Sequence, residues 1–328
     1  MCSARFFSAV FTILAFNQCS TAYVERGEAG PDYLVQGEYT GESTAFAAQV
    51  IARGDGAFEL VVFPGGLPGD GWNGAAPLRT AGARADDSVV RFSQGALRAE
   101  IADGTLSLRG LDGAAGPNAL LGRPTLKLTR IERHSPTQGV AAPPGAQVLF
   151  AQASDAGPGL NATDGRIDDR GLLAVGAESN TAFGSMQLHL EFQTPFMPDS
   201  LGQARGNSGV YLQGRYEVQV LDSFGLDPAS NDCAGIYEVA APSLNMSFPP
   251  LQWQTYDIDF EEAQFNASGG KVAPAHVSVR HNGVLVHDRV AIPEPTGLGE
   301  AEDATPGRLL LQYHLDPVFY RNVWVLPR

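Results

Sequence analysis

Apolar and polar residues alternate along several segments in the second half of the chain. Residues 186–193 read Met-Gln-Leu-His-Leu-Glu-Phe-Gln, so every second residue is apolar. Because successive side chains of a β-strand point to opposite faces, this pattern predicts a strand with one face in a core and the other toward water. The same alternation recurs over residues 216–220 and 255–260. We therefore expect strands at all three segments.

Asn282-Gly283 lies between two β-type runs. This dipeptide tolerates the positive φ angles of a two-residue hairpin turn, so it predicts an antiparallel pair of strands. Two antiparallel sheets that pack by their apolar faces leave polar outer faces, and a curved sheet would make one of these faces a groove that suits a saccharide.

The first half of the chain has shorter β-type runs, at residues 58–63, 88–92, 97–101 and 125–131, with Gly, Asp and Pro clusters between them. This spacing is typical of a small all-β domain. Residues 135–145 contain Pro136, Pro143 and Pro144, which restrict the backbone to the extended form of a linker. We expect a small β domain at 30–140 and a second domain at 145–328.

The composition supports an all-β fold class. The 328 residues include 38 Gly and 22 Pro, and no long apolar stretch has the period of a substantial helix. A length of 328 residues with 44% hydrophobic content allows two domains with buried cores.

The N-terminus resembles an export signal. Arg5 precedes an apolar stretch at residues 6–16, and Ser20-Thr21-Ala22 offers the small residues of a cleavage site. We expect residues 1–22 to be a signal peptide and the mature protein to be periplasmic or extracellular in a bacterium. The apolar stretch is too short to span a bilayer. A lipid anchor on Cys19 is the alternative, although Phe16-Asn17-Gln18 lacks the expected small residues.

Cleavage after Ala22 would leave Cys233 as the last of three cysteines, so no intramolecular disulfide could form. A buried, inert thiol is the more common role of such a residue, and a nucleophile is the rarer one.

The formal net charge of -14 argues against nucleic acid and anionic lipid as partners of the chain as a whole. A neutral or cationic partner fits this charge better.

The densest group of candidate functional residues lies at 205–222, which reads Arg-Gly-Asn-Ser-Gly-Val-Tyr-Leu-Gln-Gly-Arg-Tyr-Glu-Val-Gln-Val-Leu-Asp. Further motifs are His-Leu-Glu-Phe at 189–192, Asn-Asp-Cys at 231–233, Pro-Pro-Leu-Gln-Trp-Gln-Thr-Tyr-Asp at 249–257 and Tyr-Arg-Asn-Val-Trp at 320–324. In this order, the motifs resemble those of the 3-keto-disaccharide hydrolase family, also described as 3-keto-glucoside 1,2-lyases and 3-keto-2-hydroxyglucal hydratases. The resemblance spans residues 145–328.

The resemblance implies a concanavalin-like jelly-roll sandwich that acts on sugars already oxidised to a ketone at ring carbon 3. A 3-ketone acidifies the proton on carbon 2, so a carboxylate or a histidine can abstract it. The resulting enolate expels the leaving group from carbon 1, and addition of water completes a net hydrolysis. An upstream sugar 3-dehydrogenase would have to supply the oxidised sugar.

The candidate residues fall into two groups. For proton transfer or metal ligation we expect Glu191, Glu217, Asp222, His189 and His314. For substrate binding we expect Arg205, Asn207, Gln219, Tyr211 and Trp253, because guanidinium and amide groups recognise polar groups directionally and aromatic rings stack on sugars. The hypothesis requires Glu191, Glu217, Gln219 and Asp222 to meet around one hollow.

Most of these residues also have a structural interpretation. Glu217 and Gln219 fit the solvated face of a strand, and His189 fits a satisfied surface histidine. Trp253 fits a core residue, and Asp222 fits a cap on the following turn. For Arg321 we expect a structural ion pair or hydrogen bond and not a catalytic role.

The clustered carboxylates and imidazoles leave room for a divalent cation, but no motif spacing requires one. The tail at 312–316 reads Gln-Tyr-His-Leu-Asp, which keeps His314 but departs from the family's usual Asp-His-Gly-Asn. Leu315 stands in place of Gly there, and Tyr313 in place of an acid, so either change is expected to narrow or redirect one wall of the cleft. A lectin-like binding protein without catalysis is the alternative function.

Overall fold

The structure is a computed structural model that describes residues 21–41, 46–95, 97–110, 125–151, 159–162, 167–174 and 176–328. All but the last two residues of the predicted signal peptide at 1–22 lie outside these ranges. The described residues form an all-β protein, as expected, whose helical elements are α1 (Gly30–Val35) and the 3-10 turn η1 (Gly202–Ala204). Neither described helix has the length and apolar character needed to span a bilayer.

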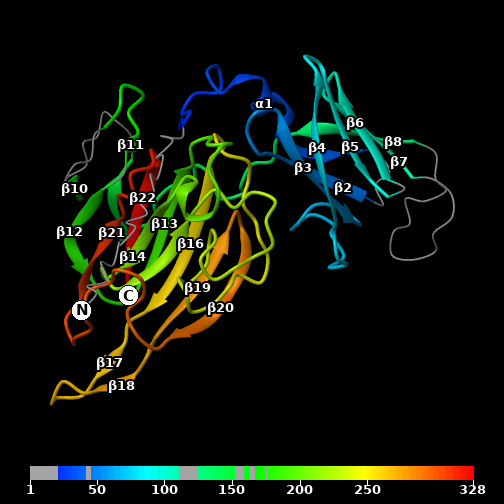
Figure 1. Cartoon of the computed structure of the whole chain (residues 1–328). Helices are drawn as coiled ribbons and strands as arrows, with labels where there is room; N and C mark the ends of the chain where they lie inside the picture. Colours follow the sequence, from blue (N-terminus) through cyan, green and yellow to red (C-terminus); the bar gives the residue numbers. More distant parts are fainter. Residues whose placement is uncertain are drawn as a thin grey trace, which may run out of the picture.

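The first half of the chain forms a closed barrel in which each strand pairs antiparallel with the next and β1 also pairs with β8. Its strands are β1 (Gly37–Thr40), β2 (Phe46–Ala52), β3 (Ala57–Pro64), β4 (Leu78–Asp86), β5 (Val89–Gln94), β6 (Leu97–Ala102), β7 (Thr105–Arg109) and β8 (Leu126–Ile131). Figure 1 shows the barrel at one end of the molecule, beside the larger second half. The apolar residues that the sequence places on alternate positions fill its interior, among them Val50, Leu60 and Leu106.

The second half contains two packed sheets. One has the order β10-β12-β21-β14-β15, and we call it the five-stranded sheet. Its strands are β10 (Leu160–Ala162), β12 (Ala177–Phe183), β21 (Gly307–Leu311), β14 (Ser208–Leu212) and β15 (Tyr216–Val220).

The facing seven-stranded sheet has the order β11-β22-β13-β16-β19-β20, with β9 paired to β22. Its strands are β11 (Leu173–Ala174), β22 (Phe319–Pro327), β13 (Met186–Gln193), β16 (Gln254–Glu261), β19 (Ala275–His281), β20 (Val284–Ile292) and β9 (Gln147–Phe150). A separate ribbon joins β17 (Gln264–Phe265) to β18 (Lys271–Ala273).

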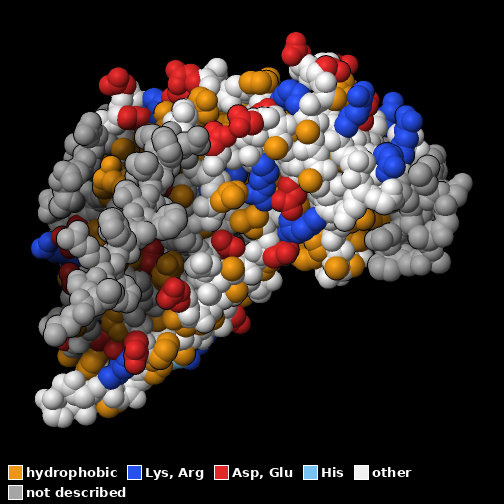
Figure 2. Space-filling model, in the orientation of Figure 1, with side chains coloured by type: hydrophobic (Ala, Val, Ile, Leu, Met, Phe, Trp, Pro, Cys, Tyr) orange, Lys and Arg blue, Asp and Glu red, His pale blue; other side chains and the backbone are white. Residues whose placement is uncertain are grey.

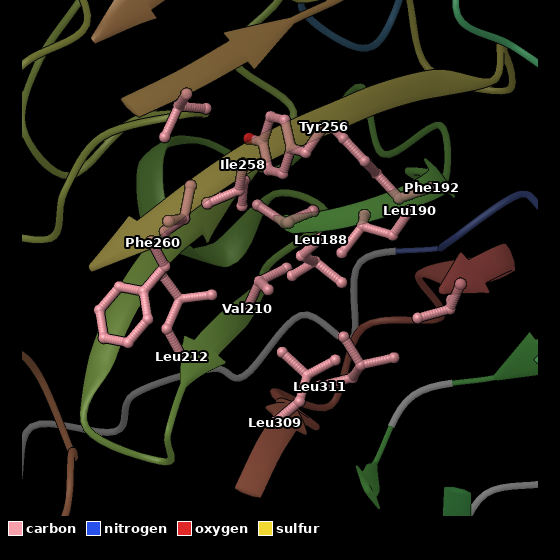
Figure 3. Packing of buried hydrophobic residues seen from close by; sticks show 14 of the residues in the cluster. Leu188, Leu190, Phe192, Val210, Leu212, Tyr256, Ile258, Phe260, Leu309 and Leu311 are labelled. Carbon is pink, nitrogen blue, oxygen red and sulfur yellow. The ribbon is translucent and has the colours of Figure 1, made fainter. Parts of the chain in front are cut away.

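The apolar faces of the two sheets form one core. Leu188 and Leu190 of β13 and Ile258 of β16 lie opposite Val210 of β14 and Leu311 of β21 in Figure 3, and all five are almost fully buried. Burying a residue of this size contributes about 1.5–3 kcal/mol. The alternation over 186–193 therefore predicted the core-facing side of β13 correctly.

The second side of β13 is partly open to water at Gln187 but closed at His189 and Glu191, so the prediction of a wet face was wrong for these two residues. His189 and Glu191 point away from the core, yet both are at most 1% exposed. The predicted linker covers them, because the backbone N–H of Gly139 donates to Glu191 at 2.6 Å and the Thr137 hydroxyl donates to Asp257 beside His189. Strand alternation shows which side chains share a face, and it does not show whether another segment covers that face.

The hairpin prediction at Asn282-Gly283 is confirmed. Strand β19 ends at His281 and β20 begins at Val284, and these two residues pair across the turn. The φ angles of Asn282 and Gly283 are 50° and 80°, which are the positive values that such a turn requires.

A buried ion pair lies where the barrel meets the sandwich. Arg205 Nε donates to Asp222 Oδ2 at 2.6 Å, and the two side chains are 2% and 1% exposed. Arg205 Nη1 also donates to the carbonyl of Ala52 in the barrel at 3.2 Å. Phe224, just after Asp222, packs with Ile51 of the barrel. The junction is therefore a packed interface and not a loose tether.

We predict that Asp222→Ala lowers the free energy of unfolding by about 3–5 kcal/mol, because it leaves the Arg205 guanidinium buried without its counter-ion. The matched control is Asp227→Ala, which breaks the ion pair with Arg79 at the same junction but removes a side chain that is 79% exposed. That variant should lose less than about 1 kcal/mol. Urea denaturation of both variants measures the difference, and equal losses would contradict the structural role of Asp222.

Candidate functional site

A pocket opens on the outer face of the five-stranded sheet, on the side away from the core. Its volume is about 280 Å³. Strands β14 and β15 supply its floor, and three loops and the segment after β21 supply its walls. The lining residues are Gln203, Asn207, Tyr211, Glu217, Gln219, Tyr237, Glu238, Gly297, Leu298, Gln312 and His314.

The register of β14 and β15 brings the central residues together. Tyr211 pairs with Glu217, and Gly209 pairs with Gln219. Val210 and Val218 point into the core from the same strands. The remaining residues of each strand must therefore point outward and share one face.

Glu217 is the buried carboxyl group of this pocket. Its side chain is 3% exposed, and burial raises its pKa from 4.5 to about 7 against the opposing effect of a hydrogen bond. That hydrogen bond comes from the Tyr211 hydroxyl, which donates to Glu217 Oε2 at 2.8 Å. Burial and the adjacent Glu217 in turn raise the pKa of Tyr211. A carboxyl group that titrates near neutrality can both accept and return a proton.

Two glycines leave the space that Glu217 occupies. A Cβ atom on Gly209 would lie 2.2 Å from Glu217 Oε1, and one on Gly297 would lie 2.6 Å from Oε2. Gly297 also has a φ of 56°, a conformation that favours glycine. Any side chain at either position would displace the carboxyl group.

Amide side chains form the wall beside Glu217. Gln219 Nε2 donates to Gln203 Oε1 at 2.9 Å, and Asn207 Nδ2 donates to the same oxygen at 3.1 Å. Among the described residues, Asn207 Oδ1 and Gln312 Oε1 are buried oxygens with no hydrogen-bond partner. Because both residues line the pocket, these oxygens can accept hydrogen bonds from hydroxyl groups of a ligand.

His314 lies at the pocket rim in the segment that departs from the family pattern. Tyr313 and Leu315 on either side of it do not line the pocket and are 52% and 82% exposed. Leu315 has a φ of 69°, a conformation that favours glycine, which is the family's residue at this place. The backbone at Leu315 thus keeps the left-handed conformation that a glycine would adopt. Asp316 connects this segment to the pocket loop, because its Oδ2 accepts a hydrogen bond from the Asn207 backbone N–H at 2.8 Å.

A second polar cluster lies on the seven-stranded sheet, beneath the predicted linker. His189 Nδ1 lies 2.6 Å from Asp257 Oδ1, while Arg321 and Asn322 donate to the two oxygens of Glu191 at 2.7 and 3.0 Å. Burial alone would raise the pKa of Glu191, but His189, the Gly139 N–H and these donors lower it to about 2. Burial by itself would lower the pKa of His189. The carboxylates of Asp257 and Glu191 have the larger combined effect, and the pKa of His189 is raised. Every charged group here has a partner.

The ten predicted site residues therefore separate into three places. Those that line the pocket are Glu217, His314, Asn207, Gln219 and Tyr211. Those in or beside the second cluster are His189, Glu191 and Trp253, whose ring centroid lies 3.9 Å from the Arg321 guanidinium. Arg205 and Asp222 form the ion pair at the barrel junction. The expected meeting of Glu191 and Asp222 with Glu217 and Gln219 around one hollow does not occur, so the four-residue form of the hypothesis was wrong. Of the four, the pocket keeps Glu217 and Gln219.

Sequence reasoning missed six lining residues. Gln203 precedes the recognised segment, and Gln312 lies in the tail beside His314, so nearness to predicted site residues was the one signal that could have found them. The other four, Tyr237, Glu238, Gly297 and Leu298, come from loops without a periodic pattern.

Metal ligation was an open alternative for these carboxylates and imidazoles. In the part of the chain that the structure describes, no three His, Cys, Asp or Glu side chains are grouped as a metal site would need.

Comparison with known proteins identifies the second half of the chain. Residues 159–326, just over half of the chain, match the family described as the 3-keto-alpha-glucoside-1,2-lyase-like domain. A solved structure described as a "putative glycosyl hydrolase" from Parabacteroides distasonis is 30% identical with a TM-score of 0.50, over 57% of this chain and 85% of that one.

Two further structures from the same organism carry the same description. They are 19% and 14% identical with TM-scores of 0.39 and 0.40, and they cover 56% of this chain and 99% and 94% of their own. No curated protein matches the chain.

We predict that the pKa of Glu217 makes stability depend on pH. Its folded pKa of about 7 lies above its ordinary value of 4.5, so the unfolded chain loses the proton first and stability falls as pH rises between these values. Glu217→Gln should remove this fall and gain about 2–3 kcal/mol relative to wild type between pH 4.5 and pH 8. Urea denaturation at several pH values measures the gain, and a constant difference between the two proteins would exclude the raised pKa.

Proposed function

Because the chain belongs to the 3-keto-alpha-glucoside-1,2-lyase-like domain family, we propose that it cleaves 3-keto-glycosides, with Glu217 as the base that abstracts the proton from carbon 2 of the sugar. The coarser conclusion, a glycosyl hydrolase-like enzyme that acts on carbohydrate, rests on the family match and on the structural similarity at 30% identity.

The raised pKa of Glu217 is the observation that carries this proposal. A base with a pKa near 7 is half ionised at neutral pH, and it is strong enough to take a proton that an adjacent ketone has acidified. Glu191, with a pKa of about 2, is a far weaker base and is already paired with Arg321. The pocket therefore offers a better carboxylate base than the second cluster. His189 of that cluster is 0% exposed and lies 2.6 Å from Asp257 Oδ1, so it is closed off from a substrate.

The proposed reaction has two stages. In the first, Glu217 takes the carbon 2 proton, the electrons form the enolate of the 3-ketone, and the enolate expels the oxygen on carbon 1 to leave a double bond between carbons 1 and 2. In the second, water adds its oxygen to carbon 1 and gives one proton to His314, which replaces the proton that His314 gave to the leaving oxygen. Glu217 returns its proton to carbon 2. The net result is hydrolysis, and no oxidant or reductant is consumed.

Other pocket residues serve binding and the leaving group in this proposal. Asn207 Oδ1 and Gln312 Oε1 accept hydrogen bonds from sugar hydroxyls, because burial leaves them without another partner among the described residues. His314, at the exposed rim, hands a proton to the departing oxygen. A volume of about 280 Å³ suits one sugar ring, since pockets for drug-sized ligands span roughly 300–1,000 Å³. The leaving group then lies outside the pocket.

Two parts of the proposal concern the cellular setting. The N-terminal sequence favours export to the periplasm or beyond. Because the reaction starts from a 3-ketone, a separate sugar 3-dehydrogenase must act first.

The test compares a 3-keto-disaccharide with its unoxidised parent. The protein should release reducing sugar from the first and none from the second, because only the ketone acidifies carbon 2. Glu217→Gln should lower kcat by about 10²–10⁴-fold, the usual contribution of a general base. The control is Glu261→Gln, which neutralises an exposed carboxylate on β16 and should leave kcat unchanged.

Two outcomes would reject the proposal. Tight binding of the 3-keto-sugar without product by a folded sample would favour the lectin-like alternative. Full activity in Glu217→Gln would show that another group is the base.

A further inference from the structure

The outer face of barrel strands β5–β8 carries a cluster of exposed cations. Arg91 on β5, Arg98 on β6, Arg109 on β7 and Lys127 on β8 all point away from the barrel core. We call these four residues the basic face. Figure 2 shows Lys and Arg side chains gathered over the end of the molecule where Figure 1 places these strands.

Two of these arginines form an unfavourable pair. Arg98 and Arg109 lie directly opposite each other in the register of β6 and β7. Like charges in directly opposite positions destabilise a sheet. Arg91 is paired with Glu100 at 3.0 Å, but among the described residues no carboxylate forms an ion pair with Arg98, Arg109 or Lys127. An anion bound between the two arginines would remove their repulsion.

The basic face is also hollowed. A cavity of about 550 Å³ lies over β5, β6 and β7. Its polar lining residues are Arg91, Arg98, Arg109, Ser93, Ser107 and Glu100, and the Glu100 carboxylate is paired with Arg91. Arg98 Nη1 donates to the carbonyls of Gly95 and Leu97, both at 2.8 Å, which fixes its guanidinium on this face. Guanidinium forks and hydroxyl groups are the donors that bind carboxylates and sugar hydroxyls.

The charge of this face contrasts with the rest of the chain. Residues 141–328 contain 22 acidic and 10 basic residues, so the domain with the pocket repels anions. The basic face concentrates four cations and a single acid, Glu100, on four neighbouring strands. An anionic ligand would therefore be directed to the barrel and away from the pocket.

We propose that the basic face binds an acidic oligosaccharide, with a uronate carboxylate between Arg98 and Arg109. Neighbouring strands lie roughly 4.8 Å apart, so one carboxylate can contact both guanidinium groups. This site is separate from the pocket at Glu217. In this proposal the barrel holds the protein on charged carbohydrate.

Two other polyanions fit the face less well. Single-stranded nucleic acid binds where aromatic rings stack on its bases, and none of the described residues on β5–β8 is an exposed aromatic. Segments that lie in a membrane surface bury apolar side chains beside their cations, and no large hydrophobic residue is exposed on these four strands within the described ranges.

The test is calorimetric titration of the full chain with a galacturonate tetrasaccharide at low and high salt. We expect binding that weakens as salt rises, and no binding of the uncharged maltotetraose. Arg98→Gln with Arg109→Gln should weaken galacturonate binding at least tenfold. The charge-matched control, Arg289→Gln with Arg308→Gln, removes two exposed arginines of the sandwich and should bind like wild type.

The proposal fails if the wild-type chain does not bind galacturonate, or if both double variants bind it equally. It also fails if a single-stranded DNA oligomer or an anionic phospholipid vesicle binds the basic face more tightly. Turnover of a 3-keto-disaccharide by Arg98→Gln with Arg109→Gln should equal that of wild type. The galacturonate-binding test is therefore independent of the function proposed for the pocket. Thermal unfolding without ligand should show little change in stability in that variant, because loss of the repulsion offsets loss of the Arg98 hydrogen bonds to Gly95 and Leu97.

Discussion

The pairing register of β14 and β15 is the constraint on which the candidate site depends. It sets Tyr211 against Glu217 and Gly209 against Gln219, so one carboxyl, one phenol and one amide share a face while Val210 and Val218 hold the strands in the core. A shift of one residue would turn the polar groups into the apolar interior and the valines toward the pocket. The core between the sheets therefore fixes the position of the proposed base.

The barrel is packed against this arrangement. Arg205 belongs to the loop that also holds Gln203 and Asn207. It pairs with Asp222, two residues beyond the end of β15, and donates to the Ala52 carbonyl in the barrel. One wall of the pocket and the end of its floor strand β15 thus meet at one buried ion pair. The hydrogen bond from Arg205 to Ala52 joins this pair to the barrel. A barrel that binds acidic carbohydrate would keep the pocket near polymeric material.

The sequence predicted the all-β class, the core side of β13, the hairpin at Asn282-Gly283 and the family of the second half, because these depend on local alternation, turn chemistry and motif order. The site was predicted in part. Glu217 and Gln219 were recognised because they alternate with core residues on one strand. His189 and Glu191 show the same alternation but lie on the other sheet, and a linker covers them. Which sheet a strand joins and which segment covers it depend on long-range packing, which a local pattern does not contain.

Abstraction of the carbon 2 proton by Glu217 is the central claim, and a substrate deuterated at that carbon tests it most directly. The quantity to measure is kcat/KM for the deuterated and ordinary 3-keto-glycosides as a function of pH. We predict that the ordinary sugar reacts several times faster and that both rates rise to a plateau as the pH passes about 7, where Glu217 ionises. Equal rates for the two sugars, with no change across that pH range, would contradict the account.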